Sequence, residues 1–229
     1  MILALALMAV PSADPALEAL FADPPPPPSC SVTLTVDVTD ARAGQTERQV
    51  YAYDREADAW TYVSVDGEPP APGEREDARD EAADRILPAD YYADALGRGD
   101  LDWAAVPGRP GLYRAADLPG GEIEMDGRDV SKRVMIEYAV EDAPGGPRLT
   151  NAAARLKKPW RIPFIARVDV LEIAWDYAPA GPGTGAPGAM LPIAERITFK
   201  GDVTGERHDT LIETGYSGWD CVPGEAKGP

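Results

Sequence analysis

Apolar and polar residues alternate along the first predicted strand of this chain. From Cys30 to Thr39 the apolar residues occupy every second position, and serine, threonine or aspartate separate them. A period of two is typical of a strand with one buried and one solvated face. Gln49–Tyr53 and Trp60–Val65 are predicted to pair as a hairpin, and Asp66-Gly67 ends the second of them with a strong turn motif.

Further strands are predicted along the rest of the chain, with glycine- and proline-rich connections between them. They are Leu112–Ala115, Lys132–Val140, Arg148–Leu156, Val168–Tyr177, Ile193–Lys200 and Thr210–Thr214. Within Val168–Tyr177 the apolar face changes parity, which predicts a bulge or a sharp bend. The predicted fold class is therefore mainly β: an antiparallel sheet of roughly eight to eleven strands that curls into a half-open barrel as its twist accumulates.

Short helices are predicted before and between the strands. Pro15–Ala22 follows a capping aspartate and shows helical spacing, and Pro24–Pro28 then forms a stiff polyproline spacer. Glu74–Leu87 is acidic with a thin apolar side, and Asp90–Leu96 resumes the helical pattern until Gly97 ends it. Helices inserted between early strands are expected to lie over the open mouth of the curled sheet as a lid.

The first thirteen residues resemble an export signal. Met1–Val10 is an unbroken apolar run, too short to span a bilayer, and cleavage is expected after Ser12 or Ala13. The basic residues usual at the start of such a signal are absent, so it is atypical. The expected organisation is a signal peptide (1–13), a short helix with the polyproline spacer (14–29), a single half-barrel domain (30–222) and a disordered tail (223–229), in a periplasmic protein.

Two cysteines lie near opposite ends of the chain, Cys30 and Cys221. In an exported protein an even number of cysteines favours a disulfide, which here would join the first strand to the last. The alternative is a pair of buried thiols.

Charge narrows the choice of partners. The formal net charge is −17, which argues against nucleic-acid binding. Arg155–Arg167 is the exception, since it holds five cations, no acid and two prolines. A protruding loop is expected here, with Lys157, Lys158, Trp160, Arg161 and Phe164 as contacts to an anionic membrane surface or a membrane receptor. The alternatives are a gate for the barrel mouth and a half-buried connector.

No motif for catalysis stands out. His208 is the only histidine and lies in a charged turn, and Ser217 lacks the full glycine pattern of a nucleophile elbow. No His/Cys cluster points to a metal, no glycine-rich loop points to a nucleotide, and no cofactor is expected. Paired carboxylates remain a route to a hydrolase, because the chain offers 39 acidic residues.

Ala59–Pro70 (AWTYVSVDGEPP) resembles the tryptophan-containing strand and Asp-Gly turn of the periplasmic lipoprotein-localisation carriers, the LolA/LolB-like fold. The stretches WRIPFIARVDVLEIAWDYAP and ITFKGDVTG…GYSGWD are similar to the closing strands of that family. The resemblance covers most of Cys30–Cys221. It implies a half-open barrel, capped by helices, whose concave apolar face takes the acyl chain of a lipid or lipoprotein. Arg48 and Arg155 are the candidates for the functional arginine of those carriers.

The residues expected to line the concave face share parity within their strands. They are Val32, Leu34, Val36, Trp60, Tyr62, Val134, Ile136 and Ile173. The leading hypothesis is a non-catalytic carrier for an acyl chain. The alternatives are a periplasmic scaffold with a filled barrel, and a hydrolase.

Overall fold

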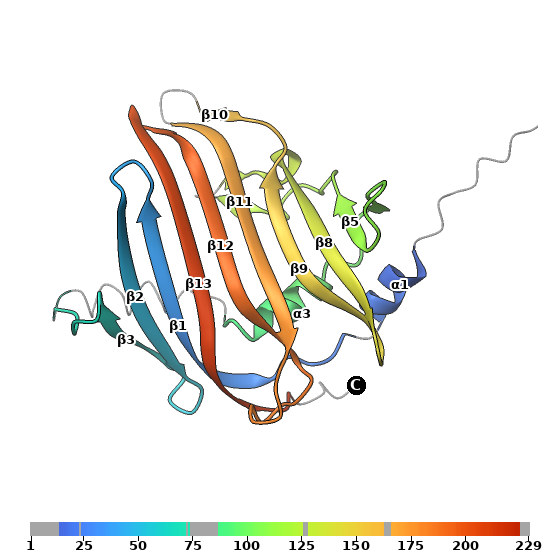
Figure 1. Cartoon of the computed structure of the whole chain (residues 1–229). Helices are drawn as coiled ribbons and strands as arrows, with labels where there is room; N and C mark the ends of the chain where they lie inside the picture. The colour runs from blue at the N-terminus through green and yellow to red at the C-terminus, as the bar shows by residue number, and fades with distance from the viewer. Residues whose placement is uncertain are drawn as a thin grey trace, which may run out of the picture.

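The computed structural model describes residues 14–22, 24–71, 73, 87–125, 128–162 and 166–224. Eleven strands form one antiparallel sheet, in the order β3-β2-β1-β13-β12-β11-β9-β8-β5-β4, with β10 paired to β11 alone. The sheet is strongly curled but does not close into a barrel (Figure 1). This confirms the predicted fold class.

The strands of the sheet follow one another with short connections, except for the longer segments between β3 and β4 and between β5 and β8. Its strands are β1 (Ser29–Asp40), β2 (Gln45–Asp54), β3 (Ala59–Val65), β4 (Trp103–Ala105), β5 (Leu112–Ala115), β8 (Val134–Ala143), β9 (Gly146–Leu156), β10 (Trp160–Ile162), β11 (Ala166–Pro179), β12 (Met190–Val203) and β13 (Glu206–Val222). A separate small hairpin is formed by β6 (Glu124–Met125) and β7 (Arg128–Asp129), and the described α-helices are α1 (Pro15–Ala22) and α3 (Asp90–Leu96).

Most predicted elements are present, and the differences have local reasons. The expected bulge in β11 lies between Val168 and Val170. The strand predicted from Lys132 begins only at Val134, because Ser131–Arg133 forms a 3-10 turn. The last strand was expected to span five residues and spans seventeen, because pairing with β1 carries it past Gly218, which has a φ of 63°. Most of Glu74–Leu87 lies outside the described residues, as does Met1–Ala13.

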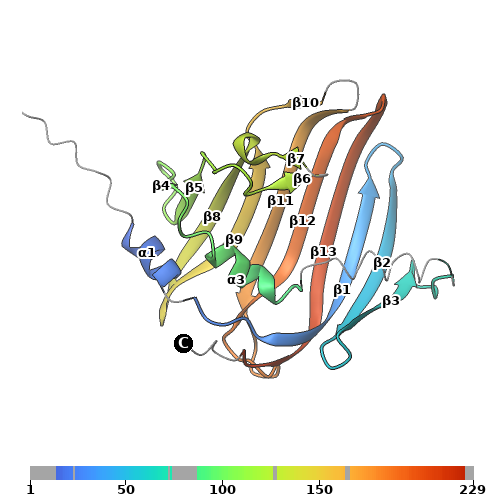
Figure 2. The same cartoon turned by 180° about the vertical axis from the view of Figure 1, so that it is seen from behind.

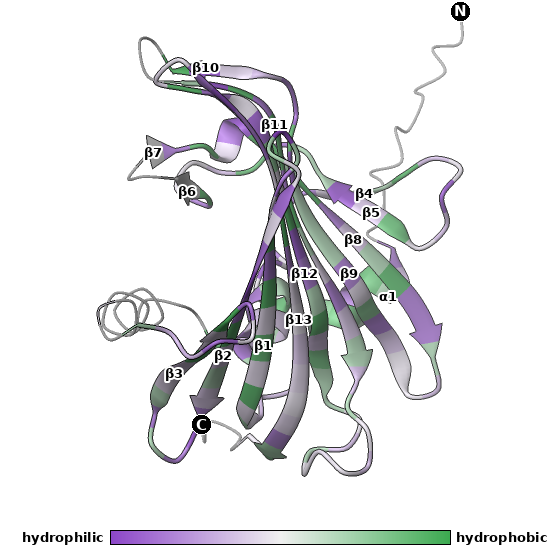
Figure 3. Cartoon of the chain, turned by 60° about the vertical axis from the view of Figure 1, so that its left-hand side comes forward, coloured by the Kyte–Doolittle hydropathy of each residue, from purple (hydrophilic) through white to green (hydrophobic). Residues whose placement is uncertain are grey.

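The register gives the sheet two chemically different faces. Side chains on the concave face form two apolar clusters, one over β5, β8, β9 and β11 with α1 and α3, and one over β1, β2 and β13. Along the strands, apolar and polar residues alternate in bands (Figure 3). Figure 2 shows α3 and the β6–β7 hairpin in front of this concave face.

Ion pairs dominate the opposite, convex face. Glu137 is buried there between Arg114 and Arg155, at N–O distances of 2.6 Å and 2.7 Å. Arg48 pairs with Asp37 at 2.7 Å, and this contact lowers the pKa of that aspartate. The two arginines considered for a functional role therefore serve cross-strand ion pairs, facing away from the concave side.

A disulfide joins Cys30 and Cys221, as predicted. The two cysteines are directly opposite in the β1–β13 register, and their Cα atoms are 4.0 Å apart. They form a third, smaller apolar cluster with Ala89, Ala186 and Leu191. Within the described part of the chain, no helix is long and apolar enough to cross a membrane.

Candidate functional site

A cavity of about 390 Å³ lies between the concave face of the sheet and α3. Its floor comes from β8, β9 and β11, and its opposite wall comes from α3 and the segment before β6. The lining side chains are mostly apolar or aromatic, with three charged groups at the rim. The residues that shape it most are Ile136, Ala152, Ala154, Ile173, Trp175 and Tyr177 on the floor, and Tyr91, Asp94, Arg98, Glu122 and Ile123 opposite.

Tyrosines hold α3 over this floor. The hydroxyl of Tyr138 donates to the carbonyl of Ala95 at 2.6 Å, and that of Tyr177 donates to the carbonyl of Tyr91 at 3.4 Å. Burial raises the pKa of both phenols, so both remain protonated donors at neutral pH. The helix is thus fixed in part through its backbone, and the side chains of Tyr92, Ala95 and Leu96 pack beside the cavity in the core cluster.

Small residues create the space of the cavity. Ala152 and Ala154 lie on β9, directly opposite Trp175 and Ile173 of β11 in the register. Alanine side chains between two rows of larger residues leave a depression in the sheet surface. The run Ala152-Ala153-Ala154 is visible in the sequence, and an alanine run within a strand was the available sign of this floor.

One polar group beneath the cavity wall lacks a partner. The indole nitrogen Nε1 of Trp175 is buried and, among the described residues, has no hydrogen-bond partner. Tyr91 packs edge-on against the same ring, at 6.0 Å between ring centroids. An unpaired buried donor of this kind costs about 1–3 kcal/mol and calls for an explanation.

Arg98 lies between two carboxylates at the rim. Its guanidinium nitrogens are 3.7 Å from Asp94 and 3.3 Å from Glu122. The rim therefore carries one cation and two anions, which disfavours a further anion from a ligand. None of these three residues was predicted from sequence, because α3 and the segment before β6 meet only in the folded chain.

The predicted cavity residues share the concave face but divide between several places. Ile136 and Ile173 line the cavity, and Val134 is buried in the cluster beside it. Leu34 and Val36 are buried in the cluster over β1 and β2, where Trp60 and Tyr62 also pack. Val32 belongs to that second cluster and also lines a smaller cavity.

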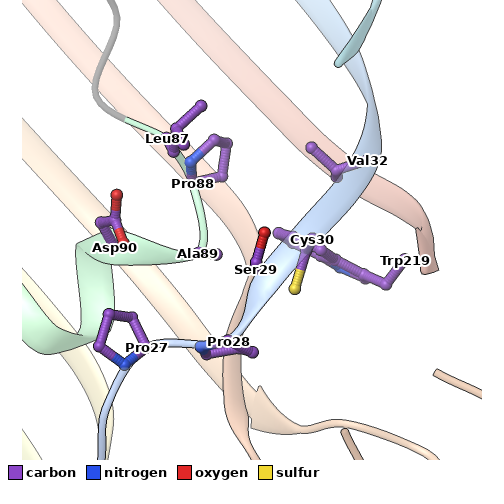
Figure 4. A pocket seen from close by; sticks show the side chains of 10 residues that line it. All are labelled: Pro27, Pro28, Ser29, Cys30, Val32, Leu87, Pro88, Ala89, Asp90 and Trp219. Atoms are coloured by element: carbon purple, nitrogen blue, oxygen red, sulfur yellow. The ribbon is translucent and has the colours of Figure 1, made fainter. Parts of the chain in front are cut away.

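The smaller cavity, of about 150 Å³, lies beside the disulfide. Figure 4 shows Pro27 and Pro28 of the polyproline spacer, and Leu87 to Asp90 at the start of α3, facing Cys30 and Trp219. Burial raises the pKa of Asp90 there. The spacer thus packs against the start of α3 at this end of the sheet.

The predicted surface residues are partly displaced from their expected positions. Lys158 and Arg161 are exposed as expected, and Trp160 is half-buried against the main cluster. Lys157 was expected to be exposed, but its ammonium group donates to the carbonyl of Lys132 at 3.1 Å and its side chain is only 25% exposed. Trp160–Ile162 also pairs with β11 as a short strand, so the chain stays attached to the sheet there. Phe164 lies outside the described residues.

His208 and Ser217, the histidine and serine considered for catalysis, are far apart in the structure. His208 and Ser217 lie nine positions apart on β13, which places them more than about 20 Å apart along an extended strand. Within the described ranges, no group of three or more His, Cys, Asp or Glu side chains could hold a metal ion.

Comparison with known proteins adds no family assignment. No protein-family model matches the chain, and no curated protein matches it significantly.

Proposed function

We propose that this protein is a non-catalytic carrier that binds the acyl chain of a lipid or lipoprotein in its concave cavity. The observation that carries the proposal is the apolar hollow under α3, framed by Ile136, Ile173 and Trp175. Its volume of about 390 Å³ falls in the range of about 300–1,000 Å³ typical of small-molecule pockets.

The polar groups of the cavity favour an esterified or amide-linked chain. Asp94 and Glu122 already exceed the single charge of Arg98, so a free carboxylate would meet net repulsion at the rim. A carbonyl oxygen would instead accept a hydrogen bond from Trp175 Nε1 after a small shift of the ring of Tyr91, and this would relieve the unpaired donor.

The cell compartment belongs to the same proposal. A disulfide is stable in oxidising compartments, and this is compatible with an exported protein. We propose that residues 1–13 direct export to the periplasm, where the protein acts in the manner of the LolA/LolB-like carriers that its sequence resembles.

The test is a titration with a fluorescent short-chain diacylglycerol and with the matching fluorescent fatty acid. Ala154→Phe fills the cavity floor and should weaken binding of the diacylglycerol about tenfold or more. Ala104→Phe, on the exposed edge strand β4, is the matched control and should leave binding unchanged. The wild type should prefer the diacylglycerol to the fatty acid.

A protein that takes up neither probe, or an Ala154→Phe variant that binds like the wild type, would overturn the proposal. Circular dichroism and urea unfolding of both variants establish that they are folded. Native mass spectrometry of protein from its own cell envelope then identifies the bound acyl chain.

A filled scaffold is the second candidate. It is favoured by the half of the concave face over β1–β3, where the protein's own aromatic rings occupy the surface. Tyr51 and Tyr62 stack there at 4.7 Å between ring centroids. The same titration separates the two candidates, because a scaffold gives no saturable uptake.

A further inference from the structure

The structure brings cations from two distant segments to one end of the cavity. Lys132 and Arg133, in the 3-10 turn before β8, lie beside Lys157 at the end of β9. The backbone N–H of Lys157 donates to the carbonyl of Arg133 at 2.8 Å. With Lys158 and Arg161, these residues form what we call the basic cluster.

Trp160 is part of the same surface. The guanidinium carbon of Arg133 lies over its indole ring, 5.0 Å from the ring centroid. A half-buried tryptophan under a cation suits the boundary between apolar and aqueous surroundings, where indole rings concentrate in membrane proteins.

The charges of the basic cluster are only partly neutralised. Asp117 is 3.8 Å from Lys157, and Asp129 interacts electrostatically with Lys132, so among the described residues two carboxylates oppose five cations. Within the described ranges, Lys158 and Arg161 have no ion-pair or hydrogen-bond partner. The surface therefore keeps a net positive charge on a chain of net charge −17.

The β10–β11 hairpin carries an unfavourable pairing. Arg161 is directly opposite Arg167 in the register. Like charges at directly opposed positions destabilise a strand pair. Asp169 lies 2.7 Å from both Arg167 and Arg207, whereas Arg161 has no ion-pair partner among the described residues.

The basic cluster adjoins the cavity through three elements. Arg133 is three residues before Ile136 on β8, and Lys157 is three residues after Ala154 on β9, so each is roughly 10 Å from the floor. Ser131 accepts a hydrogen bond from the N–H of Ile123, which lines the opposite wall, at 2.9 Å. The basic cluster thus lies beyond one end of the cavity without lining it.

We propose that the basic cluster docks this end of the molecule on an anionic lipid bilayer. Each cation near such a surface contributes up to about a fivefold gain in partitioning, and the attraction extends over a Debye length. An acidic protein that carries a local positive surface would approach the bilayer in one orientation only.

Vesicle sedimentation tests this docking. The wild type should bind phosphatidylcholine vesicles that contain one quarter phosphatidylglycerol, should not bind pure phosphatidylcholine vesicles, and should be released by high salt. Lys158→Glu with Arg161→Glu should lower partitioning at least about 25-fold, because two attractive contributions of about fivefold are lost and two repulsive charges are added.

The control carries the same charge change elsewhere. Arg109→Glu with Arg196→Glu alters two exposed cations, one in the turn before β5 and one on the convex face. This variant should bind like the wild type. Equal losses in the two variants, or full binding by the first, would overturn the proposal.

A wild type that does not bind anionic vesicles would also overturn it. The acyl-probe titration uses no vesicles. If docking fails but the probe is taken up normally, the carrier proposal stands. If docking succeeds but the probe is not taken up, the carrier proposal fails and the docking proposal stands.

Discussion

The two halves of the concave face are stabilised in different ways. Over β8, β9 and β11, helices cover the sheet and buried tyrosine hydroxyls hold α3 in place. Over β1–β3, the described residues form a surface of cross-strand aromatic pairs, such as Tyr53 with Trp60 at 5.2 Å between ring centroids. One half thus depends on hydrogen-bonded helix attachment, and the other depends on ring contacts between neighbouring strands.

This difference explains where a cavity forms. Rings that stack on neighbouring strands fill the surface they cover, because each occupies the gap beside the next. Where α3 is attached through its backbone, the alanines on β9 leave a gap between the helix and the sheet. The position of the cavity therefore follows from the kind of contact that each half uses.

The largest effect is expected from the disulfide, which belongs to neither of the two larger clusters. Replacing Cys30 and Cys221 together by serine should lower the free energy of unfolding by about 2–5 kcal/mol, because the unfolded chain regains the entropy of a very long loop. Urea unfolding measures this loss.

Amide exchange of the double serine variant then tests the comparison. Since the disulfide constrains the whole chain, both halves should exchange faster by a similar factor. Faster exchange in β1–β3 alone would mean that the two halves unfold independently. A reducing agent should not affect the variant, and this serves as the control.

A smaller effect is expected from the tyrosine hydroxyls. Tyr138→Phe removes the hydrogen bond to Ala95 in a buried position and should cost about 1–2 kcal/mol, with faster amide exchange in Asp90–Leu96. Tyr51→Phe is the matched change in the other half, where the hydroxyl donates to Gln49 at a partly exposed position. It should cost less than about 0.5 kcal/mol. Equal costs would contradict the distinction between hydroxyl and ring contacts.

The smallest effect concerns Asp90 at the start of α3. Burial raises its folded-state pKa above the unfolded value of about 3.9, so its ionised form disfavours folding at neutral pH. Asp90→Asn should raise the urea midpoint slightly at pH 7. The gain is reduced because the variant loses the favourable interaction of a carboxylate with the start of the helix.

The sign of this effect gives a second readout for Asp90. As the pH falls through the folded-state pKa, the wild type binds its proton more readily when folded and gains stability relative to the variant. The difference in urea midpoint should therefore shrink towards pH 4. A difference that grows on acidification would show that Asp90 is stabilised as an anion.

The sequence predicts the elements well where local pattern decides them. The bounds of α1, α3 and β5 match, and the bulge in β11 and the disulfide are confirmed. The predicted length of β13 was wrong. The glycines after Thr214 indicated the end of a strand, but pairing with β1 outweighs local propensity there. β4 and β10 were not predicted, because three-residue strands leave no periodicity to read.

The candidate site was harder to predict than the fold. Parity placed Ile136 and Ile173 on the correct face, but parity alone does not say which part of that face is hollow. The rim charges Asp94, Arg98 and Glu122 come from separate segments, and only tertiary packing brings them together. Lys157 was wrongly expected to be exposed, because a nearby backbone carbonyl captures its ammonium group.

The position of the disulfide also determines how the chain bears a pulling force. Cys30 and Cys221 are separated by 191 positions in sequence, and little of the described chain lies outside them. Tension applied to the two ends therefore passes from β1 directly to β13 through the sulfur atoms. The loop between them, with the cavity and α3, carries no load, and of the described segments α1 and the polyproline spacer would be pulled away. Under such a force the molecule would lengthen by the extension of α1 and the polyproline spacer. The cavity would keep its shape.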